Sequence, residues 1–543
     1  MLNDLSNRPV PSKIFCLVIL IIIFFCLPLL GALKDKDLIR PNILFVMSDD
    51  HTTQALGVYG SRLASLNPTP NIDRLAREGM LFTNVFCNNS ICTPSRASIL
   101  TGQYPQTNGV IDLNGRLRGS RQYLPRELNK LGYHTALVGK WHLKEEPSAF
   151  DYYSVLPGQG EYFDPVFRVR GEKAWPEVTI QKKGHSSDVI TQLGLDWLET
   201  KWDRQRPFFL MHHFKAPHDM FEFAPRYAEY LAETKIPEPL SLYSAGNHGS
   251  VATKGSVDRL VHRIGASVSR RNVIRNMGMH MGIAQDIPDP EYAHLSYQEY
   301  LKRYLRCVKG VDDNMKRLYD YLEREGLLDN TIVIYTGDQG LMLGEHDFID
   351  KRWMYEESMR MPFLVRYPRM VEAGSKADLL VNNTDFAPTL IELAGGEVPQ
   401  YMQGASFRRV LETGKEPENW RTSTYYRYWM HMAHRLGNPA HFGIRTKRYK
   451  LIFYYGLDYR DSERVKIDQG DRRNPRIATP PAWEFYDLQN DPHEMDNRYN
   501  DDGYMEVISS LKKELRRLRE ELNETDDNYP HLQAIVSRYW DQR

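Results

Sequence analysis

The sequence has no excess of either charge. Lys and Arg together number 70, Asp and Glu also number 70, and the formal net charge at pH 7 is therefore zero. A balanced chain has no overall field that attracts nucleic acid or an anionic membrane surface. We expect no nucleic-acid partner, and an anionic substrate would have to be recognised by local positive charges.

Cysteine is scarce: the chain of 543 residues contains five. Cys16 and Cys26 fall in an apolar N-terminal run, and the odd remainder of Cys87, Cys92 and Cys307 excludes a disulfide framework. Two interpretations stay open. Either Cys87 and Cys92 form a disulfide and Cys307 is buried, or Cys92 is kept unpaired because the protein uses it.

A long hydrophobic run occurs at the N-terminus, in residues 14–30. Arg8 and Lys13 precede it and small residues follow at 31–32, a pattern typical of a secretory signal peptide over residues 1–32. The alternative is an uncleaved anchor, since the run is slightly short of a span of ~20 residues. Both predict export to the periplasm, the medium or the cell surface, with membrane contact only if the segment stays uncleaved.

Short apolar runs that end in polar residues recur along the chain, without internal repeats or low-complexity tracts. They are "NILFVMSDD" (42–50), "TALVGKWH" (135–142), "FFLMHHFKAPH" (208–218), "TIVIYTGDQG" (331–340) and "FLVRYP" (363–368). Amphipathic stretches lie between them. This alternation predicts an α/β fold with a mostly parallel sheet sandwiched by helices.

Charged and metal-binding residue types follow these runs. The carboxyl ends of parallel strands gather at one edge of a sheet, where active sites are built. The residues expected at that edge are Asp49, Asp50, Lys140, His142, His218, Asp338 and Gln339.

The residue pattern of the sequence changes after about residue 415. "HFGIRTKRYKLIFYYG" and "AWEFYDLQNDPHEMDN" predict antiparallel strands with turns. Ile508, Leu511, Leu515, Leu518 and Leu522 then repeat at helical spacing, and their face is expected to pack on this small sheet. We predict a catalytic domain over 38–415 and a smaller α+β domain over 416–543.

Three carboxylates and a carboxamide, from Asp49, Asp50, Asp338 and Gln339, form a set of oxygen donors. Such donors suit Ca²⁺ or Mg²⁺, whereas zinc would favour His or Cys. The alternative is that these residues only cap loops.

The segment "SICTPSRASILTG" (90–102) places a cysteine at the expected start of a helix. Pro94 suits a first turn and Gly102 suits the end. Cys92 would then lie at the positive end of the helix dipole, with Arg96 one turn on. The pattern indicates an anion site built around a potential nucleophile.

Several of these segments together resemble the type I, formylglycine-dependent sulfatases, the arylsulfatase and polysaccharide sulfatase group of the alkaline phosphatase superfamily. "CTPSRASILTG" resembles their signature and "GKWH" (139–142) their second motif. The Asp49-Asp50 pair and "TGDQG" resemble their calcium-binding segments, and "DKRWMYEESMRMPFLVRYP" (350–368) resembles the segment that holds a late lysine. The resemblance extends from about 40 to 400 and implies an alkaline-phosphatase-like fold and hydrolysis of sulfuric esters.

The resemblance implies that a formylglycine-generating maturation enzyme oxidises Cys92 to formylglycine. One hydroxyl of the hydrated aldehyde would attack sulfur and form a formylglycine-sulfate intermediate, and the other would expel the sulfate. One Ca²⁺ ion would be held by Asp49, Asp50, Asp338, Gln339 and the modified Cys92. Gln339 departs from the asparagine more often found at its position, which puts its ligation in doubt.

The resemblance also assigns roles to the remaining residues. Arg96 and Lys140 would steady the formylglycine and the sulfate, and His142 would be the base. His218 and Lys351 would hold the sulfate or protonate the leaving oxygen. The alternatives are structural histidines and a solvated Lys351. His346, in "GEHD", is interpreted as a supporting or structural histidine rather than a ligand.

The expected substrate is a sulfated saccharide. "DKRWMYE" is similar to glucosamine-6-sulfatases and favours a 6-O-sulfated amino sugar, with other polysaccharides and aryl sulfates left open. Possible sugar contacts, which could equally be packing residues, are Tyr425, Arg427, His434, Arg435 and His441. Alternative functions are a phosphatase or phosphodiesterase of the same superfamily, disfavoured by Cys92 and Gln339, and a non-catalytic glycan-binding relative.

Overall fold

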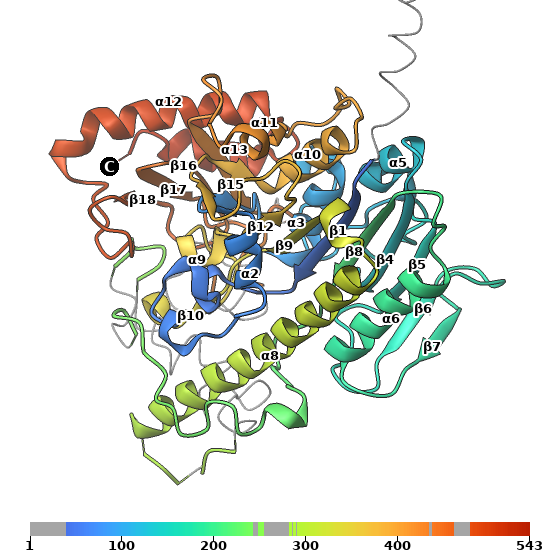
Figure 1. The fold of residues 1–543 in the computed structure, drawn as a ribbon. Helices are drawn as coiled ribbons and strands as arrows, with labels where there is room; N and C mark the ends of the chain where they lie inside the picture. The colour runs from blue at the N-terminus through green and yellow to red at the C-terminus, as the bar shows by residue number, and fades with distance from the viewer. Residues whose placement is uncertain are drawn as a thin grey trace, which may run out of the picture. The chain divides into compact units, whose positions relative to one another are not determined.

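The runs predicted as parallel strands form the centre of one large sheet (Figure 1). Its order is β13 (Ser375–Ala377), β2 (Met80–Phe82), β12 (Phe363–Arg366), β9 (Thr331–Gly337), β1 (Asn42–Ser48), β8 (Phe208–His213), β4 (His134–Lys140), β5 (Tyr152–Leu156), β6 (Val166–Val169) and β7 (Thr179–Gln181). The neighbours β9, β1, β8, β4 and β5 run parallel. "FLVRYP" forms β12, which pairs antiparallel with β9, so the sheet is mixed but mostly parallel at its centre, as predicted.

The structure is a computed structural model and describes residues 40–242, 248–254, 282–284, 286–288, 290–433, 437–460 and 478–542. Residues 42–543 form one compact unit. The predicted signal segment, residues 1–32, lies outside the described residues. None of the helices in the described ranges is long and apolar enough to cross a membrane.

Helices pack on the two faces of the sheet (Figure 1). On β8, a side chain at Gly194 of α6 (Ser186–Thr200) would meet the ring of His212. The next residue, His213, points the other way: its ring lies 6.3 Å from that of Phe45, which is 6.3 Å from that of Phe386 in α10 (Phe386–Leu393). Successive strand residues face opposite sides, so β8 is buried on both.

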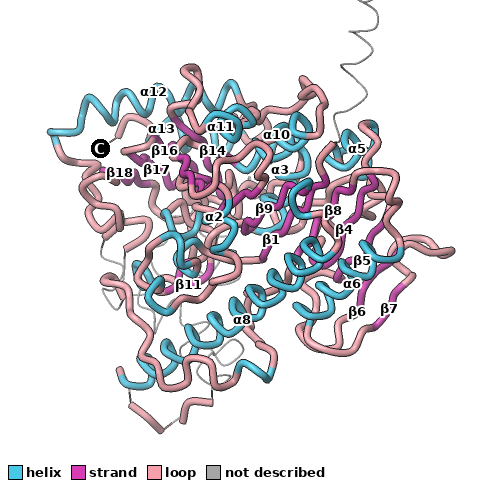
Figure 2. The backbone as a smooth tube through the Cα atoms, viewed as in Figure 1, coloured by secondary structure: helices cyan, strands magenta, loops and turns pink. Residues whose placement is uncertain are grey.

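The other helices extend these two layers. On the side of α6 lies α8 (Glu291–Arg324), and on the side of α10 lie α3 (Cys92–Thr101) and α5 (Tyr123–Lys130). Figure 2 shows the strands enclosed between these helices and loops. Shorter elements are α2 (Asp73–Glu78), α4 (Pro105–Asn108), α9 (Glu356–Met359), α11 (Arg408–Thr413), the paired β3 (Val85–Phe86) and β14 (Val381–Asn382), and the paired β10 (Met342–Leu343) and β11 (Ile349–Asp350).

A second, antiparallel sheet follows in the C-terminal part, as predicted. It consists of β15 (Ser423–Tyr428), β16 (His441–Thr446), β17 (Tyr449–Tyr454) and β18 (Ala482–Asp487). α12 (Met505–Glu521) packs its apolar face on this sheet, where Leu511 and Leu515 share a buried cluster with Phe442 and Phe453. α13 (Pro530–Tyr539) joins the same cluster. The predicted domain boundary falls between α11 and β15 and stays a prediction.

The described cysteines are all reduced and buried. Cys87, Cys92 and Cys307 are free. The interpretation that Cys87 and Cys92 form a disulfide is therefore wrong, and the alternative, that Cys92 remains unpaired, describes the fold.

Candidate active site

Cys92 is the first residue of α3 and is 1% exposed. The helix ends at Gly102, which takes a left-handed φ of 64° that favours glycine, as the sequence predicted. The Sγ of Cys92 lies 3.3 Å from Oδ1 of Asp49 and 3.7 Å from Nε2 of Gln339. Burial raises the pKa of this thiol to about 12. Cys92 as a free thiol is therefore protonated at neutral pH, despite its place at a helix start.

Two neighbouring strands deliver the acidic residues. β1 and β9 are parallel and in register, so that Ser48 lies opposite Gly337. Asp49 and Asp50, after β1, therefore meet Asp338, after β9, and each carboxylate offers an oxygen within 4.8 Å of the others. The backbone N–H of Asp50 donates to Oδ1 of Asp338 over 3.1 Å. The three side chains are almost completely buried.

The donor set fits a hard divalent cation. Three buried carboxylates repel one another unless cations lie between or beside them. Gln339, adjacent to them, has a buried Oε1 without a hydrogen-bond partner. Carboxylate and carboxamide oxygens are the ligands that Ca²⁺ takes in proteins. The residues that would hold such an ion are thus Asp49, Asp50, Asp338 and Gln339, with the side chain of residue 92 beside them.

Three cationic side chains surround the carboxylates. The Nε of Arg96 donates to Asp338 over 2.9 Å, the ammonium of Lys140 contacts Asp49, and Nζ of Lys351 donates to Asp50 over 2.6 Å. Burial alone raises the pKa of Asp338, but Arg96, Lys140 and Lys351 together bring it below its ordinary value. All three side chains are buried rather than solvated, and burial holds the pKa of Lys140 well below its ordinary value although the charge of Asp338 opposes this shift.

The position of Lys140 depends on the glycine that precedes it in β4. Gly139 has a φ of 94°, and a Cβ there would lie 1.9 Å from the carbonyl oxygen of His213. β4 can therefore approach β8 closely only with glycine at this position. The carbonyl of Lys140 then accepts hydrogen bonds from Arg96 (3.0 Å) and from Nδ1 of His213 (3.0 Å). His213 is a supporting residue that sequence reasoning missed, although it lies at a strand end.

The two predicted histidines lie beside the cations. Burial, followed by the charges of Lys140 and Arg96, holds the pKa of His142 far below its usual range, so its imidazole is neutral. The Nδ1 of His142 is buried without a hydrogen-bond partner. The Nε2 of His218 lies 3.6 Å from Oδ2 of Asp50, and its Nδ1 lies 2.8 Å from the carbonyl of Asp219.

Part of this cluster of charged residues lines a pocket of about 380 Å³. Cys92, Asp50, His218 and Lys351 line it together with four polar residues that the sequence did not single out: Gln159, Asp219, Asp350 and Arg352. Asp350 and Arg352 flank Lys351 and have φ values of 82° and 88°. Strain of this kind is concentrated at functional sites. The adjacency of Asp350 and Arg352 to Lys351 is the one sequence signal that could have identified these two residues.

The described candidates for sugar contacts lie outside this pocket. Tyr425 and Arg427 are buried in the C-terminal cluster, and Arg427 is ion-paired with Asp526 at 2.7 Å and stacked on Trp429. His441 is buried, with its Nδ1 2.7 Å from the carbonyl of Pro439. These positions agree with packing, the alternative interpretation, and sugar contact stays a prediction. His434 and Arg435 lie outside the described residues.

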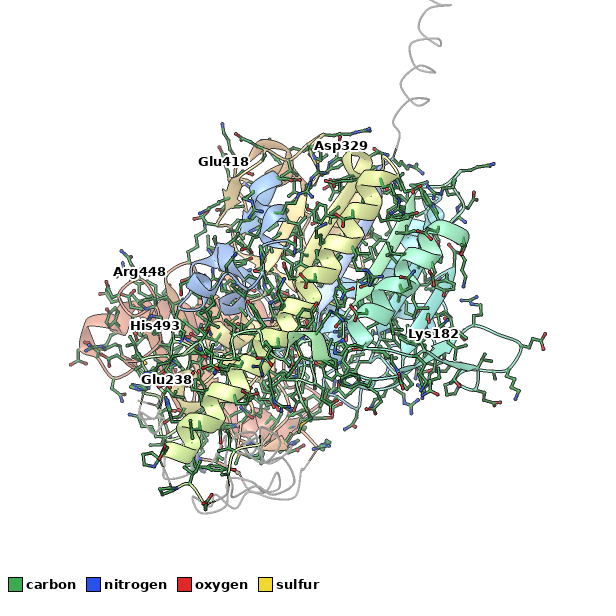
Figure 3. The ribbon with its side chains drawn as sticks, turned by 60° about the horizontal axis from the view of Figure 1, so that its bottom comes forward. Lys182, Glu238, Asp329, Glu418, Arg448 and His493 are labelled. Carbon is green, nitrogen blue, oxygen red and sulfur yellow. The ribbon has the colours of Figure 1, made fainter. Side chains whose placement is uncertain are left out.

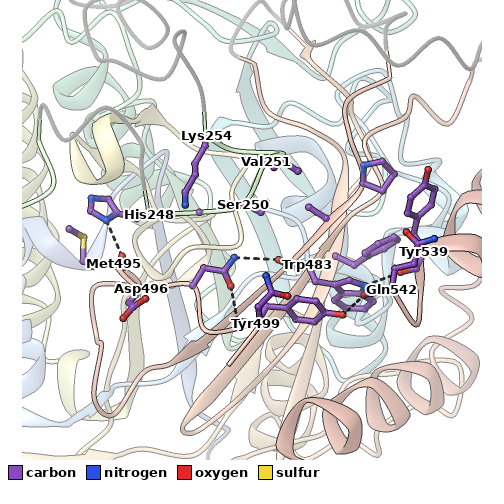
Figure 4. Close-up of a pocket in the computed structure, with 16 residues that line it drawn as sticks. His248, Ser250, Val251, Lys254, Trp483, Met495, Asp496, Tyr499, Tyr539 and Gln542 are labelled. Atoms are coloured by element: carbon purple, nitrogen blue, oxygen red, sulfur yellow. Dashed lines mark hydrogen bonds between the residues drawn. The ribbon is translucent and has the colours of Figure 1, made fainter. Parts of the chain in front are cut away.

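A second pocket, of about 470 Å³, lies beside β18 (Figure 4). Trp483 and Tyr499 stack on each other in its wall, and Asp496, Tyr539 and Gln542 also line it. None of the predicted catalytic residues faces it. Three of the predicted catalytic residues, Cys92, His218 and Lys351, line the pocket of about 380 Å³ instead.

Comparison with known proteins agrees with this geometry. The profile of the sulfatase family matches residues 41–396. The chain belongs to the sulfatase family. A second profile, that of the N-sulphoglucosamine sulphohydrolase C-terminal region, matches residues 344–468 and 477–521 of this sulfatase. The predicted enzyme class, a sulfatase that hydrolyses sulfuric esters, is confirmed.

Two relatives extend along most of the chain. The N-acetylglucosamine-6-O-sulfatase of Bacteroides thetaiotaomicron is 38% identical over 93% of this sulfatase and 90% of its own length. A solved structure, described as a complex with its substrate D-glucosamine-2-N,6-O-disulfate, has a TM-score of 0.74, 37% identity, and coverage of 90% of this chain and 99% of that one.

The phosphonate monoester hydrolase of Silicibacter pomeroyi shares the fold alone. Its TM-score is 0.65 at 19% identity, over 89% of this chain and 95% of that chain. The predicted alkaline-phosphatase-like architecture is confirmed by these neighbours and by the mixed sheet of the structure.

Proposed function

We propose that this sulfatase releases the 6-O-sulfate of an N-substituted glucosamine, with Cys92 oxidised to formylglycine and one calcium ion bound. The observation that carries the substrate is the relative that is 38% identical over 93% of the chain and acts on N-acetylglucosamine-6-O-sulfate. Support comes from the similar structure that holds D-glucosamine-2-N,6-O-disulfate.

Two further groups, a formylglycine side chain and a calcium ion, belong to this proposal. Formylglycine at position 92 would supply a hydroxyl nucleophile in place of the thiol. Calcium on Asp49, Asp50, Asp338 and Gln339 would supply positive charge beside that residue and the sulfate. The buried, unpartnered Oε1 of Gln339 and the clustered carboxylates are the features that fit the ion.

The chain's own residues then bind and polarise the ester. Sulfuryl transfer moves negative charge onto the leaving oxygen, and catalysis relies on fixed positive charge and positioning. Lys351 and His218 line the pocket and would hold the sulfate oxygens or protonate the leaving oxygen. Lys140 and Arg96 lie deeper and fix the residues around position 92.

His142 is suited to accept a proton. Its imidazole is neutral because burial and the neighbouring cations Lys140 and Arg96 lower its pKa. A neutral imidazole whose Nδ1 has no hydrogen-bond partner can act as a base on a hydroxyl at position 92.

The pocket walls suit a sugar ring. Asp219, Asp350 and Gln159 offer acceptors for sugar hydroxyls, Arg352 offers a guanidinium for an anionic substituent, and Tyr300 and Phe221 offer apolar surface. Polar groups placed on an otherwise apolar wall are typical of small-molecule sites. We assign the specificity for the amino sugar to these residues.

Export from the cytoplasm remains part of the proposal and rests on residues 14–30. Fractionation of cells that express the full chain, followed by mass determination of the N-terminus, tests it. A mature protein outside the cytoplasm that lacks residues 1–32 is expected.

The decisive experiment measures sulfate release by protein coexpressed with a formylglycine-generating enzyme, beside the variant Cys92→Ala. The substrates are N-acetylglucosamine-6-sulfate, D-glucosamine-2-N,6-O-disulfate, the 3-O-sulfated isomer, N-acetylgalactosamine-6-sulfate and an aryl sulfate. We expect release from the 6-O position of glucosamine, lost in the variant.

Two results would contradict the proposal. Release from another position of glucosamine alone, or from N-acetylgalactosamine-6-sulfate alone, would overturn the assigned substrate. Hydrolysis of matched phosphate esters but of no sulfate ester, with formylglycine confirmed by mass spectrometry, would overturn the assigned chemistry.

A further inference from the structure

A second cluster of ligand-type side chains lies outside the active site. His346 belongs to the turn Glu345–Asp347 between β10 and β11, Glu357 to α9, and Glu494 to the loop after β18. Each offers one ligand atom, and these atoms all lie within 4.8 Å of one another. His346 is 3% exposed and Glu494 is completely buried. The cluster shares no residue with the carboxylates around Cys92.

Two of the three side chains have a buried atom without a hydrogen-bond partner, and the third is held by an ion pair. The unpartnered atoms are Nε2 of His346 and Oε2 of Glu357, whereas Oε1 of Glu494 is ion-paired with Nζ of Lys450 at 2.6 Å. A buried polar atom left without a partner destabilises the fold. Two such atoms beside the carboxylate of Glu494, from three segments of the chain, indicate a ligand that satisfies them together.

The charges at the cluster are unbalanced. Three nearby carboxylates have cationic partners: Glu345 with Arg62 (2.9 Å), Glu356 with Arg445 (3.1 Å) and Glu494 with Lys450 (2.6 Å). Among the described residues, Glu357 has no ion pair. Lys450 also lies 3.0 Å from Glu356 and can pair with that carboxylate instead, which would leave Glu494 as well as Glu357 for a cation.

We propose that His346, Glu357 and Glu494 bind a zinc ion. One imidazole nitrogen and two carboxylate oxygens are a ligand set that Zn²⁺ accepts, whereas calcium takes oxygen alone. Zinc bonds of ~2.0–2.2 Å require the ligand atoms to move somewhat closer together, and water would complete a tetrahedral site. The site is thus distinct from the calcium site in its donors as well as in its residues.

The proposed ion would link the segment 346–357, which contains Lys351, to the C-terminal sheet. His346 and Glu357 lie on either side of Lys351 in the sequence, and Glu494 follows the last strand of the small sheet. An ion shared by these three residues would fix both ends of the segment that carries Lys351. Its role is positioning, because none of the three residues lines the pocket of Cys92.

The test is the metal content of the full-length protein. Wild type is dialysed against Zn²⁺ and then against metal-free buffer, and the bound zinc is quantified by elemental mass spectrometry. We expect one zinc per chain in wild type, and loss of that zinc in His346→Gln and Glu357→Gln. His493→Gln is the matched control, an exposed histidine next to Glu494 (Figure 3), and it should retain the zinc.

Thermal unfolding provides the second measurement. Zinc should raise the Tm of wild type and of His493→Gln but not of His346→Gln, because an ion that binds only the folded state stabilises it. Wild type without zinc would overturn the proposal even if the variants failed to fold. Equal zinc in wild type and in both ligand variants would also overturn it, since the ion would then be held elsewhere.

Discussion

The Nε of Arg96 donates a hydrogen bond to Oδ2 of Asp338 over 2.9 Å and thereby joins α3, the helix that begins at Cys92, to the end of β9. The same guanidinium donates to the carbonyl of Lys140 and places Nη2 3.7 Å from Oδ1 of Asp49. One planar group thus orients residues from three strands. A lysine has the same charge but cannot make these directed contacts.

We therefore expect Arg96→Lys to lose ~10²–10³-fold in kcat, the range found when one preorganised donor is removed from an active site. Steady-state hydrolysis of N-acetylglucosamine-6-sulfate measures it. Arg118→Lys, at an exposed position, is the control and should keep the wild-type rate. A kcat unchanged in Arg96→Lys would show that charge alone suffices.

Gln339 is the residue whose ligation the sequence left in doubt. Its Oε1 is buried without a partner, beside three carboxylates. Gln339→Leu removes this oxygen and leaves a shorter, apolar side chain. We expect the calcium concentration for half-maximal activity to rise on the order of 10–100-fold, a range typical of damage around a metal site.

Titration of calcium into chelator-treated enzyme measures this change. Full activity should return at high calcium, because only one of the ligands is missing. Gln489→Leu, which alters an exposed amide after β18, is the control and should leave the calcium dependence unchanged. The ligand assignment fails if both variants require the same calcium as wild type.

The strand-end argument located the acidic cluster because it depends on local patterns only. Asp49 and Asp338 each follow a buried apolar run, and β1 and β9 proved to be neighbours. The antiparallel insertion of β12 beside β9 was not predictable in this way, because an apolar run carries no information on its direction.

The residues at the sides of the pocket were less predictable from the sequence than the acidic cluster beside Cys92. Arg352 reaches the pocket through a loop with positive φ, which no periodic pattern indicates. The reverse holds for Arg427, whose aromatic surroundings in the sequence suggested a sugar site. That arginine is stacked on Trp429 and paired with Asp526 in a packed interior, a long-range arrangement that composition does not reveal.

Arg352 provides a test of substrate recognition. It lines the pocket beside Lys351, and its Nη1 donates weakly to Tyr428 over 3.4 Å. We expect Arg352→Gln to lower kcat/KM for D-glucosamine-2-N,6-O-disulfate by at least about 10-fold through KM, because a contact to a remote substituent is lost. Hydrolysis of an aryl sulfate, which lacks that substituent, should change little. Equal losses on both substrates would place Arg352 in the chemistry instead.

The stability of the C-terminal sheet should depend on the protonation of Glu524. This side chain is completely buried, its Oε2 lacks a hydrogen-bond partner, and burial raises its pKa to about 7. The folded state therefore keeps the proton that the unfolded chain releases near its ordinary pKa of about 4.3. Because the folded state binds more protons in this interval, its free energy of unfolding falls as the pH rises from about 4.5 to about 7.

Glu524→Gln removes this titration and preserves the shape of the side chain. We compare the free energy of unfolding of the variant with that of wild type at each pH. The difference, variant minus wild type, should be about 2.5 kcal/mol larger at pH 8 than at pH 5, because only wild type buries a carboxyl that ionises in the unfolded chain. Urea unfolding followed by tryptophan fluorescence at the two pH values measures the difference. Glu520→Gln, at an exposed position of α12, is the control and should show no such change. A constant difference between wild type and Glu524→Gln at both pH values would mean that Glu524 is ionised in the fold, with Arg427 and Arg519 as its nearest positive charges.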